Sequence, residues 1–344
     1  MLERNTLTNL ANRDPALVIR DMGMAYAFSQ ALYVAATLGI ADLVAASPTT
    51  AVELAKATNT HAPSLYRVLR LLAGAGVFVE REDGRFALTP AAGCLRRDVP
   101  GSMRQLITLW GAEEYRAFGD LIHSVKTGLP AFDHAYGMGI FQYLSQNPAA
   151  GKIFNEALTE WGGQNHAAVV KAYGFSGFRK IIDVGGGHGA LITTILKANP
   201  HLRGVLFDQP SVVEGGKGQI EAAGLTDRCE AVGGDFFDFV PAGADVCCLS
   251  LVIHDWDDDQ SLAILKNCRR ALPAGATLLL LEVLVGPRNE PDWGKISDVY
   301  MLVLTSGRER TVAEYGALLA DAGFKLTKTV PTESVMTVIE GIAV

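Results

Sequence analysis

The sequence feature that most constrains this chain is a short apolar run, 181–184, that leads directly into the glycine-rich segment 185–189. Glycines let the backbone turn sharply after a strand and let a ligand approach where a Cβ would collide. Further apolar runs follow at 205–207, 246–253 and 277–284, with helix-like stretches between them. Strands that alternate with helices in this way predict a parallel sheet with helices on both faces.

The end of the chain breaks this alternation. Two apolar runs, 324–330 and 335–339, have only residues 331–334 between them. A connection this short has no room for a crossover helix, so the last two strands are expected to be antiparallel. The predicted fold class is therefore α/β, with a Rossmann-like sheet that ends in an antiparallel strand.

The first hundred residues carry signals for helices and one hairpin. Asp14 before a proline predicts a helix start, and Thr50 with Glu53 forms a capping-box pattern. Ser64 is expected to open a further helix, and Asp83-Gly84 between two apolar runs is a hairpin turn signal. Helices followed by a β-ribbon are the order of a winged helix.

These patterns predict three parts. Residues 1–100 are expected to form a mostly α-helical winged-helix domain, and residues 101–175 a helical linker that contributes to a substrate pocket. Residues 176–344 are expected to form the Rossmann-like, cofactor-binding domain. The length of 344 residues by itself suggests about two domains.

The glycine loop alone fits two ligands. Its spacing also satisfies the GxGxxA pattern of dinucleotide-binding loops, and Asp208 at the end of the next strand suits the ribose hydroxyls of either ligand. Asp183 before the loop would repel a pyrophosphate, whereas S-adenosylmethionine carries positive charge. Asp235 and Phe236 after the third strand suit an adenine, with the acid on the amine and the ring on the base. The loop and its acids therefore favour S-adenosylmethionine.

His254 is the candidate base. It follows the apolar run 246–253, so it is expected at the carboxyl edge of the sheet, where ligands bind in open α/β folds. A phenol has a pKa near 10, so its nucleophilic anion is scarce at neutral pH, and an imidazole can take the proton as attack begins. Glu282 lies in an apolar run and needs a partner, for which His254 is a candidate. Glu309 is expected to approach the imidazole from the other side.

Taken together, these residues resemble the caffeate-type and small-molecule O-methyltransferases, which are winged-helix class I methyltransferases that use S-adenosylmethionine. The resemblance covers most of the chain and rests on five motifs in order: 183–187, 207–210, 234–237, 254–256 and 309–311. It implies that the cofactor contacts are Gly185, Asp208, Asp235 and Phe236. It implies that His254 is the base and that Glu282 and Glu309 orient it. It also implies a homodimer built on the N-terminal helices, and no metal.

One position departs from the family pattern. Four residues before the base the family usually carries Lys or Arg as a cofactor contact, and this chain carries Ser250. A weaker hold on the cofactor, or a different pocket edge, is the expected consequence. The family also contains members that bind S-adenosylmethionine and catalyse a reaction other than methylation, which keeps that alternative open.

The acceptor is expected to be a small aromatic or polyketide-like metabolite of secondary metabolism. Phe154, Leu158, Trp161 and Met301 fall at positions that look like the family's pocket wall. Aromatic and sulfur-containing side chains suit a flat ring, although ordinary core packing explains the same residues. Methylation of a nitrogen on a heteroaromatic ring is the alternative to methylation of a hydroxyl.

Composition excludes several other classes of protein. The formal net charge of −7 argues against a protein that holds nucleic acid or an anionic membrane, since both need a positive field. The N-terminal segment 1–11 lacks the apolar core of a signal peptide, and no apolar run is long enough to span a membrane. The five cysteines lack metal-site spacing and suit free thiols in a reducing cytoplasm.

Overall fold

The structure is a computed structural model that describes residues 14–344, so the segment 1–11 lies outside the described residues. The chain divides into two compact units. One holds the described residues up to Asp120 together with Phe141–Trp161, and the other holds Leu121–Ile140 and Gly162–Val344. The segment predicted to be a linker, 101–175, is thus shared between the two units. Each unit is described by itself.

The N-terminal unit begins with helices and a small sheet. Its first elements are α2 (Pro15–Gly23), α3 (Ala25–Thr37), α4 (Ile40–Ala46), β1 (Thr49–Thr50), α5 (Ala51–Thr58), α6 (Ala62–Gly74), β2 (Phe78–Glu80) and β3 (Arg85–Leu88). The three strands form an antiparallel sheet in the order β1-β3-β2, so the predicted hairpin is present. Then follow α7 (Pro90–Gly93), α8 (Arg104–Gly111), α9 (Glu113–Phe118), α12 (Ile140–Gln146) and the first part of α13 (Pro148–Ala172).

Local capping explains where these helices start. The Asp14 carboxylate accepts a hydrogen bond from the Ala16 amide at 2.8 Å, and Thr50 and Glu53 form the reciprocal capping box. The prediction that Ser64 opens α6 is wrong. The helix begins two residues earlier, with Pro63 in its first turn, where a missing amide costs nothing.

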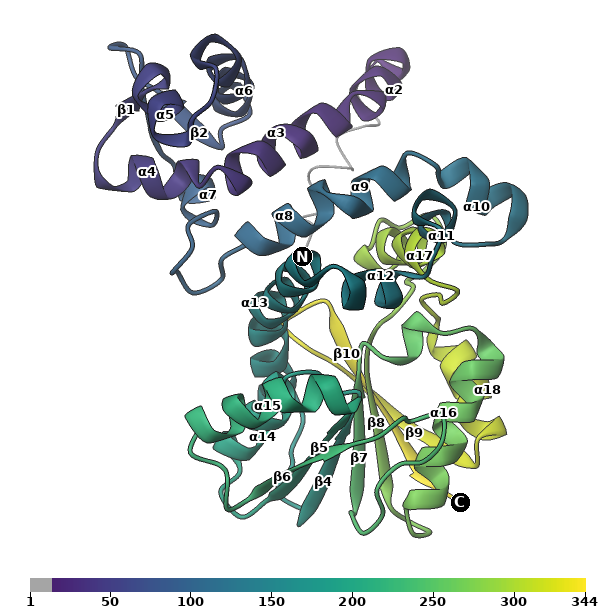
Figure 1. The fold of residues 1–344 in the computed structure, drawn as a ribbon. Helices are drawn as coiled ribbons and strands as arrows, with labels where there is room; N and C mark the ends of the chain where they lie inside the picture. The colour runs from purple at the N-terminus through teal and green to yellow at the C-terminus, as the bar shows by residue number, and fades with distance from the viewer. Residues whose placement is uncertain (1–13) are drawn as a thin grey trace. The chain divides into compact units, whose positions relative to one another are not determined.

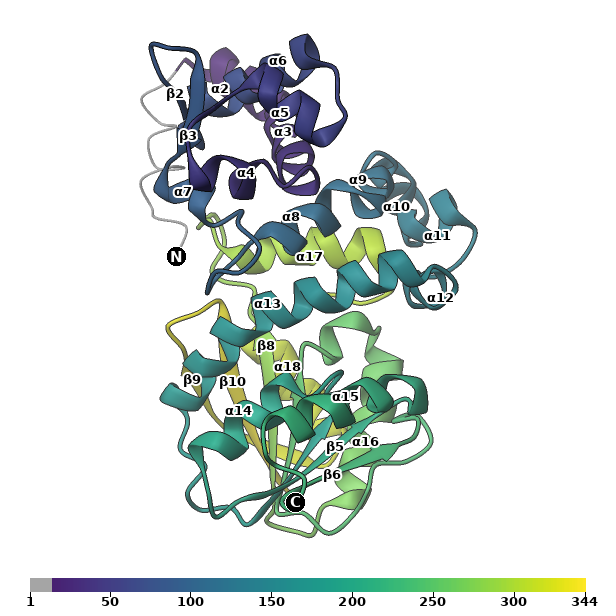
Figure 2. The same ribbon diagram turned by 60° about the vertical axis from the view of Figure 1, so that its left-hand side comes forward.

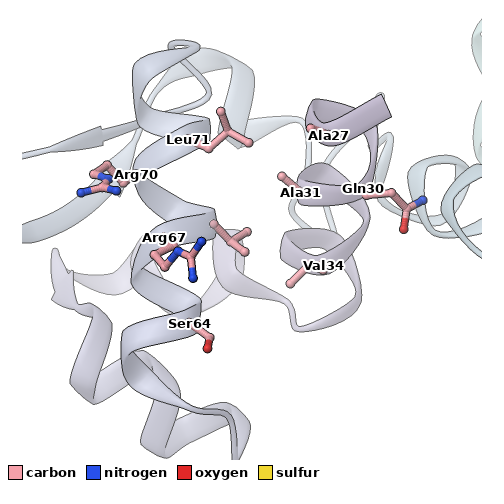
Figure 3. A pocket seen from close by; sticks show the side chains of 9 residues that line it. Ala27, Gln30, Ala31, Val34, Ser64, Arg67, Arg70 and Leu71 are labelled. Atoms are coloured by element: carbon pink, nitrogen blue, oxygen red, sulfur yellow. The ribbon is translucent and has the colours of Figure 1, made fainter. Parts of the chain in front are cut away.

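A groove of about 560 Å³ lies between α3 and α6 of this unit. Figure 3 shows Ala27, Gln30 and Val34 on one wall and Arg67 and Arg70 on the other. None of the predicted catalytic or cofactor-binding residues lines this groove, so it is not the candidate site.

The C-terminal unit holds a seven-stranded sheet in the order β6-β5-β4-β7-β8-β10-β9. The strands are β4 (Lys180–Val184), β5 (Arg203–Asp208), β6 (Cys229–Gly233), β7 (Val246–Ser250), β8 (Thr277–Val283), β9 (Phe324–Pro331) and β10 (Met336–Ala343). The first five are parallel, and β10 is antiparallel to both neighbours. The predicted α/β class with an antiparallel last strand is confirmed. Figure 2 shows β6 and β9 near opposite edges of this sheet.

Helices cover both faces of the sheet. Figure 1 shows α14 (Ala190–Ala198) and α15 (Pro210–Ala222) on one side, and α16 (Asp258–Ala271) and α18 (Val312–Asp321) on the other. The remaining elements are α10 (Leu121–Thr127), α11 (Ala131–Tyr136), η2 (Ile253–Asp255) and α17 (Trp293–Leu304).

Two buried clusters, one on each face, hold the sheet between its helices. Because side chains alternate along a strand, Cys247 and Leu249 of β7 belong to the cluster that includes Leu265 of α16. The neighbouring Val246 and Cys248 belong to the cluster that includes Ile195 of α14. Every residue of β8 is buried, which fits a strand in the middle of a covered sheet. This rigid frame presents the carboxyl ends of five parallel strands at one edge.

Among residues 14–344, no single helix combines the length and apolar character that a membrane span needs. A bent pair of helices, Pro15–Thr37 and Ile40–Ala46, passes by length and composition alone.

Candidate active site

The glycine loop leaves the carboxyl end of β4, near the centre of the sheet. Gly185, Gly187 and Gly189 all have positive φ angles, which side-chain-bearing residues rarely adopt. A Cβ on Gly186 would lie 2.7 Å from the Asp183 carboxylate, so the loop also folds tightly over that acid. Asp183 itself is completely buried, and burial raises its pKa to about 7.

Asp208 ends β5, the strand next to β4. One of its carboxylate oxygens accepts from the Gly187 amide at 2.8 Å, and the other accepts from the Gln209 amide at 2.7 Å. Each carboxylate oxygen accepts about two hydrogen bonds, so both retain capacity toward a pair of hydroxyls. Asp208 therefore joins the glycine loop to the edge of the sheet and suits the ribose contact predicted for it.

Asp235 and Phe236 follow β6, at the edge of the sheet. The exposed Asp235 accepts from the Phe237 amide at 2.8 Å, which closes a tight turn. The side-chain amide of the buried Asn267 on α16 donates to the carbonyls of Phe236 and Phe237 at 2.7 and 2.8 Å. The ring of Phe236 also meets Trp256 edge-on, with centroids 5.9 Å apart. The aromatic residue is thus held in place next to the glycine loop, 3.6 Å from where a Gly185 Cβ would lie.

Ser250 ends β7, on the opposite side of β4 from Asp208. Its hydroxyl oxygen is shielded from solvent and has no hydrogen-bond partner among residues 14–344. An unpaired buried hydroxyl is uncommon, and a hydrogen-bonding group from outside the chain would satisfy it. Together with the glycine loop and Asp208, it fits a polar cofactor laid along the ends of β5, β4 and β7.

His254 lies farther from its strand than the sequence predicted. The run 246–253 was expected to be one strand ending at His254, but β7 stops at Ser250 and His254 lies in the 3₁₀ turn η2. Leu251 between them has a φ of +53°, which turns the chain out of the sheet. Glu282 of β8 holds the turn, because its carboxylate accepts from the amides of Val252 and Ile253 at 3.3 and 3.0 Å.

Glu309 contacts the imidazole directly. Its carboxylate lies 2.9 Å from Nδ1 of His254 and also accepts from the Ser297 hydroxyl at 2.6 Å. Glu309 is 3% exposed and His254 8%, so the contact is shielded from water. The predicted approach of Glu309 is present, whereas Glu282 binds the backbone on either side of Val252 rather than the ring.

Three acids surround the imidazole. Burial by itself lowers the pKa of His254, but Asp255, Glu309 and Glu282 outweigh it and raise that pKa well above the usual value. Asp255 lies 3.6 Å from Nε2. Burial also raises the pKa values of Asp255 and Glu282, because it disfavours their charged forms, and the negative charge of Glu309 adds to the rise. The arrangement makes the imidazole a stronger proton acceptor than a free histidine.

Two of these acids and the imidazole are also residue types that bind metal ions. Ligand atoms of His254, Glu282 and Glu309 lie within 4.8 Å of one another, close enough to enclose a cation. One nitrogen of His254 and one carboxylate oxygen of each acid already take part in hydrogen bonds. The acids at 257–259, in contrast, serve the helix: Asp257 caps α16 through the Gln260 amide, and Asp258 and Asp259 fill its first turn.

The predicted pocket wall is divided between the two units. Phe154 and Trp161 on α13 pack against the small buried cluster of Leu106, Leu109 and Ala157. Leu158 on the same helix is 40% exposed, which leaves it available to a ligand. Met301 on α17 belongs to the other unit and is buried. Their shared role in a pocket stays a prediction.

Sequence reasoning missed several residues that hold the site. Ser297 binds Glu309, Asn267 fixes the turn at 235–237, and Arg310 binds the turn around His254. Asn267 and Arg310 bind backbone carbonyls far away in the chain, which carry no sequence signal. Arg310 lies within the motif 309–311, but that motif by itself assigns a role only to Glu309.

The sheet edge and its residues define a class I methyltransferase. Family comparison agrees: an O-methyltransferase domain matches residues 118–325, and an O-methyltransferase dimerisation domain matches residues 22–98. The chain belongs to this family of O-methyltransferases, and S-adenosylmethionine is its methyl donor.

Two relatives show the range of acceptors within the family. The phenazine O-methyltransferase PhzM of Lysobacter antibioticus is 47% identical over 94% of this chain and 95% of its own length. The 8-amino-8-demethylriboflavin N,N-dimethyltransferase of Streptomyces davaonensis is 36% identical over 90% of each chain. The family thus includes enzymes named for oxygen and for nitrogen acceptors.

Two solved structures share the whole fold. LaPhzM has a TM-score of 0.92 at 46% identity and covers 96% of this chain and 100% of its own. An O-methyltransferase from neocarzinostatin biosynthesis has a TM-score of 0.83 at 33% identity, with coverage of 92% and 96%. The latter was solved with S-adenosylmethionine and 2-hydroxy-5-methyl naphthoic acid bound.

Proposed function

We propose that this chain methylates a phenolic hydroxyl of a small aromatic natural product, with His254 as the general base. The observation that carries the proposal is the 2.9 Å contact between Nδ1 of the buried His254 and Glu309. A carboxylate at Nδ1 favours the tautomer that carries its proton there, which leaves a lone pair on Nε2. The same carboxylate stabilises the positive charge that the imidazole gains when it accepts a proton.

The chain's own part in the reaction is proton removal and alignment. S-adenosylmethionine supplies a methyl group bonded to a positively charged sulfur. Transfer of that methyl group to the acceptor oxygen would leave the bonding electrons on the sulfur, and Nε2 of His254 would take the acceptor's proton. Glu309 and Glu282 hold the ring and its turn, so that the base meets the hydroxyl in one orientation.

The cofactor contacts proposed from the sequence are compatible with this arrangement. Asp208 would bind the ribose, Asp235 and Phe236 the adenine, and Gly185 and Ser250 the part nearest the sulfur. The free hydroxyl of Ser250 supports its place in this set.

The proposed acceptor follows from the relatives. One is named for a phenazine and another was solved with a hydroxylated naphthoic acid, and both ligands are flat and aromatic. Phe154, Leu158, Trp161 and Met301 are proposed to pack against such a ring. We also propose a homodimer through the dimerisation domain at 22–98, in which each partner helps to close the other's pocket.

Methylation of nitrogen is the second candidate, because a relative at 36% identity is named as an N,N-dimethyltransferase. An amine or ring nitrogen attacks with a lone pair that is already free and needs a base less. The two candidates therefore differ in their dependence on His254.

A phenazine that carries one hydroxyl and one amino group tests both candidates in a single reaction, because the two acceptors compete on one ring. The probe is incubated with S-adenosylmethionine, and NMR of the product locates the new methyl group. Methylation on oxygen supports the proposal, and methylation on nitrogen replaces it with the second candidate. A third outcome is cofactor binding by calorimetry while neither this probe nor a hydroxynaphthoic acid is methylated. That outcome would favour the alternative that this chain binds S-adenosylmethionine and catalyses a reaction other than methylation.

A further inference from the structure

The turn that carries His254 does not hold its shape by local preference. Leu251 has a φ of +53°, a left-handed conformation that a branched side chain disfavours. The following 3₁₀ turn has only three residues, Ile253–Asp255, so its own hydrogen bonds are few. A backbone of this kind persists only where surrounding groups fix it.

Arg310 supplies such groups from the opposite side to Glu282. It is fully buried, with an exposed fraction of 0%. One terminal nitrogen donates to the Ile253 carbonyl at 3.0 Å, and the other donates to the Trp256 carbonyl at 3.0 Å. These two carbonyls lie immediately before His254 and two residues after it, so one planar guanidinium spans the whole catalytic turn.

The remaining donors of Arg310 are also used. Its Nε and one terminal nitrogen bind the same oxygen of Asp258 at 3.0 and 2.7 Å, and its other terminal nitrogen reaches the Arg308 carbonyl at 3.3 Å. All five N–H groups thus have acceptors, which sets the plane of the guanidinium. Asp258 in turn begins α16, so the fork is fixed to a helix.

We propose that Arg310 is a positioning residue for the base: it holds the carbonyls of the His254 turn so that the imidazole reaches both Glu309 and the acceptor. This inference rests on the proposed role of His254. Arg310 and Glu282 act on the turn from two sides, because the acid binds its amides and the guanidinium binds its carbonyls. Neither contact touches the imidazole ring.

Gly307 supports the same conclusion independently. A Cβ at this position would lie 1.9 Å from the His254 carbonyl oxygen and 2.4 Å from the carbonyl carbon of Asp255. The loop that carries Glu309 and Arg310 therefore packs against the turn with no room for a side chain. A displacement of the loop would therefore press directly on the backbone of the turn.

Arg308 offers a matched control. It lies on the same loop and binds the same Asp258, at 3.0 Å, but its side chain reaches Glu314 instead of the turn. It is also 43% exposed, whereas the side chain of Arg310 is 1% exposed. A change at Arg308 therefore alters the ion pairs of the loop and leaves the two carbonyl contacts intact.

The test compares Arg310→Lys with Arg308→Lys. Lysine keeps the positive charge but has no planar fork, so it cannot bind both carbonyls at once. With the amino-hydroxyphenazine probe, kcat per cofactor-binding site should fall about 10- to 100-fold in R310K, while the affinity for S-adenosylmethionine stays unchanged. R308K should behave like the wild type, because an exposed ion pair contributes little.

A second readout needs no acceptor. In isotope-labelled protein, the Nδ1 proton of His254 should give a downfield NMR signal because it bonds to Glu309, and its absence in His254→Gln assigns it. We expect R310K to lose or broaden this signal and R308K to keep it. If R310K does not fold, Arg310→Met replaces it, since methionine keeps an unbranched apolar stem in the buried site and removes every donor to the two carbonyls.

The outcomes separate the two proposals. A lower melting temperature in R310K with unchanged kcat per site and an unchanged signal would show a purely structural arginine and overturn the inference. If instead H254Q retains full turnover, the base assignment fails, while the Nδ1 signal still shows whether Arg310 holds the turn. Where the probe is not turned over at all, the NMR comparison decides the inference alone.

Discussion

The two ends of the candidate site are built in different ways. On the cofactor side, along β4, β5 and β6, contacts join neighbouring loops: the Gly187 amide binds Asp208, and Asp235 binds an amide two residues away, with Asn267 as a distant partner of the same turn. On the reaction side, beyond β7, the turn around His254 is held by Glu282, Glu309 and Arg310, which lie 29 to 57 residues away in the chain from the groups that they bind.

This difference has a chemical counterpart. The cofactor side keeps free hydrogen-bonding capacity, at the carboxylate of Asp208 and the hydroxyl of Ser250, which a ligand can use. On the reaction side the chain's own side chains bind the backbone of the turn, and the imidazole is the proposed base. Changes on the cofactor side should therefore alter affinity, and changes on the reaction side should alter turnover.

The largest effect is expected for His254→Gln. Loss of the base should lower kcat about 100- to 10,000-fold, since that is the usual contribution of a positioned proton acceptor. Binding of S-adenosylmethionine by calorimetry should stay unchanged, because the side chain makes no contact on the cofactor side. His201→Gln, at an exposed histidine, is the control. A loss of cofactor binding in H254Q would contradict the division of the site.

Asp208→Ala should give the reverse pattern. Removing a carboxylate that is proposed to bind two hydroxyls should weaken S-adenosylmethionine binding about 10- to 100-fold, at about 1.5–3 kcal/mol for hydrogen bonds to a charged group. At saturating cofactor, kcat should remain close to that of the wild type. The exposed Asp227→Ala serves as the control for the loss of a charge. An unchanged affinity would remove Asp208 from the cofactor set.

Glu309→Gln tests the reaction side more finely. Glutamine keeps an acceptor for Nδ1 but removes a charge that raises the pKa of His254, so that pKa should fall. Only the neutral imidazole accepts the phenolic proton, so kcat/KM rises with pH through this pKa, and in E309Q the rise should move to lower pH. The plateau rate should drop about tenfold, because the charge no longer stabilises the imidazolium. Glu333→Gln, on an exposed acid, should leave the profile in place.

The cofactor side could be predicted from sequence better than the reaction side, for the same structural reason. Glycines that follow a strand, and acids that end the next strands, are visible as short local patterns, and Gly185, Asp208 and Asp235 lie at the sheet edge as expected. The antiparallel final strand followed from the length of one connection.

The reaction side depends on partners that no local pattern shows. The sequence placed His254 at a strand end, but the strand stops at Ser250 because Leu251 leaves the extended region. Glu282 was recognised as a buried acid in need of a partner, and its partners are backbone amides, which every residue carries. The contacts of Arg310 cannot be predicted from sequence for the same reason, because it binds two backbone carbonyls, and every residue has a backbone carbonyl.

The smallest expected effect concerns Asp183, a buried acid on the cofactor side. Its pKa in the folded chain is about 7, above the ordinary value of 3.8, because burial disfavours the charge. Between these two pH values the folded chain holds a proton that the unfolded chain has released. The stability that this proton contributes is complete below the ordinary pKa and is lost as pH rises toward 7.

Asp183→Asn cannot ionise, so its stability should not decline across that range. At pH 8 without cofactor, the variant should melt a few degrees above the wild type, with roughly 2–4 °C for each kcal/mol in a domain of this size. Near pH 4 the two should melt together. S-adenosylmethionine carries positive charge and should raise the melting temperature of the wild type more than that of D183N at pH 8. An equal rise in both would mean that the Asp183 charge does not serve the cofactor, and its burial would then belong to the packing of the glycine loop alone.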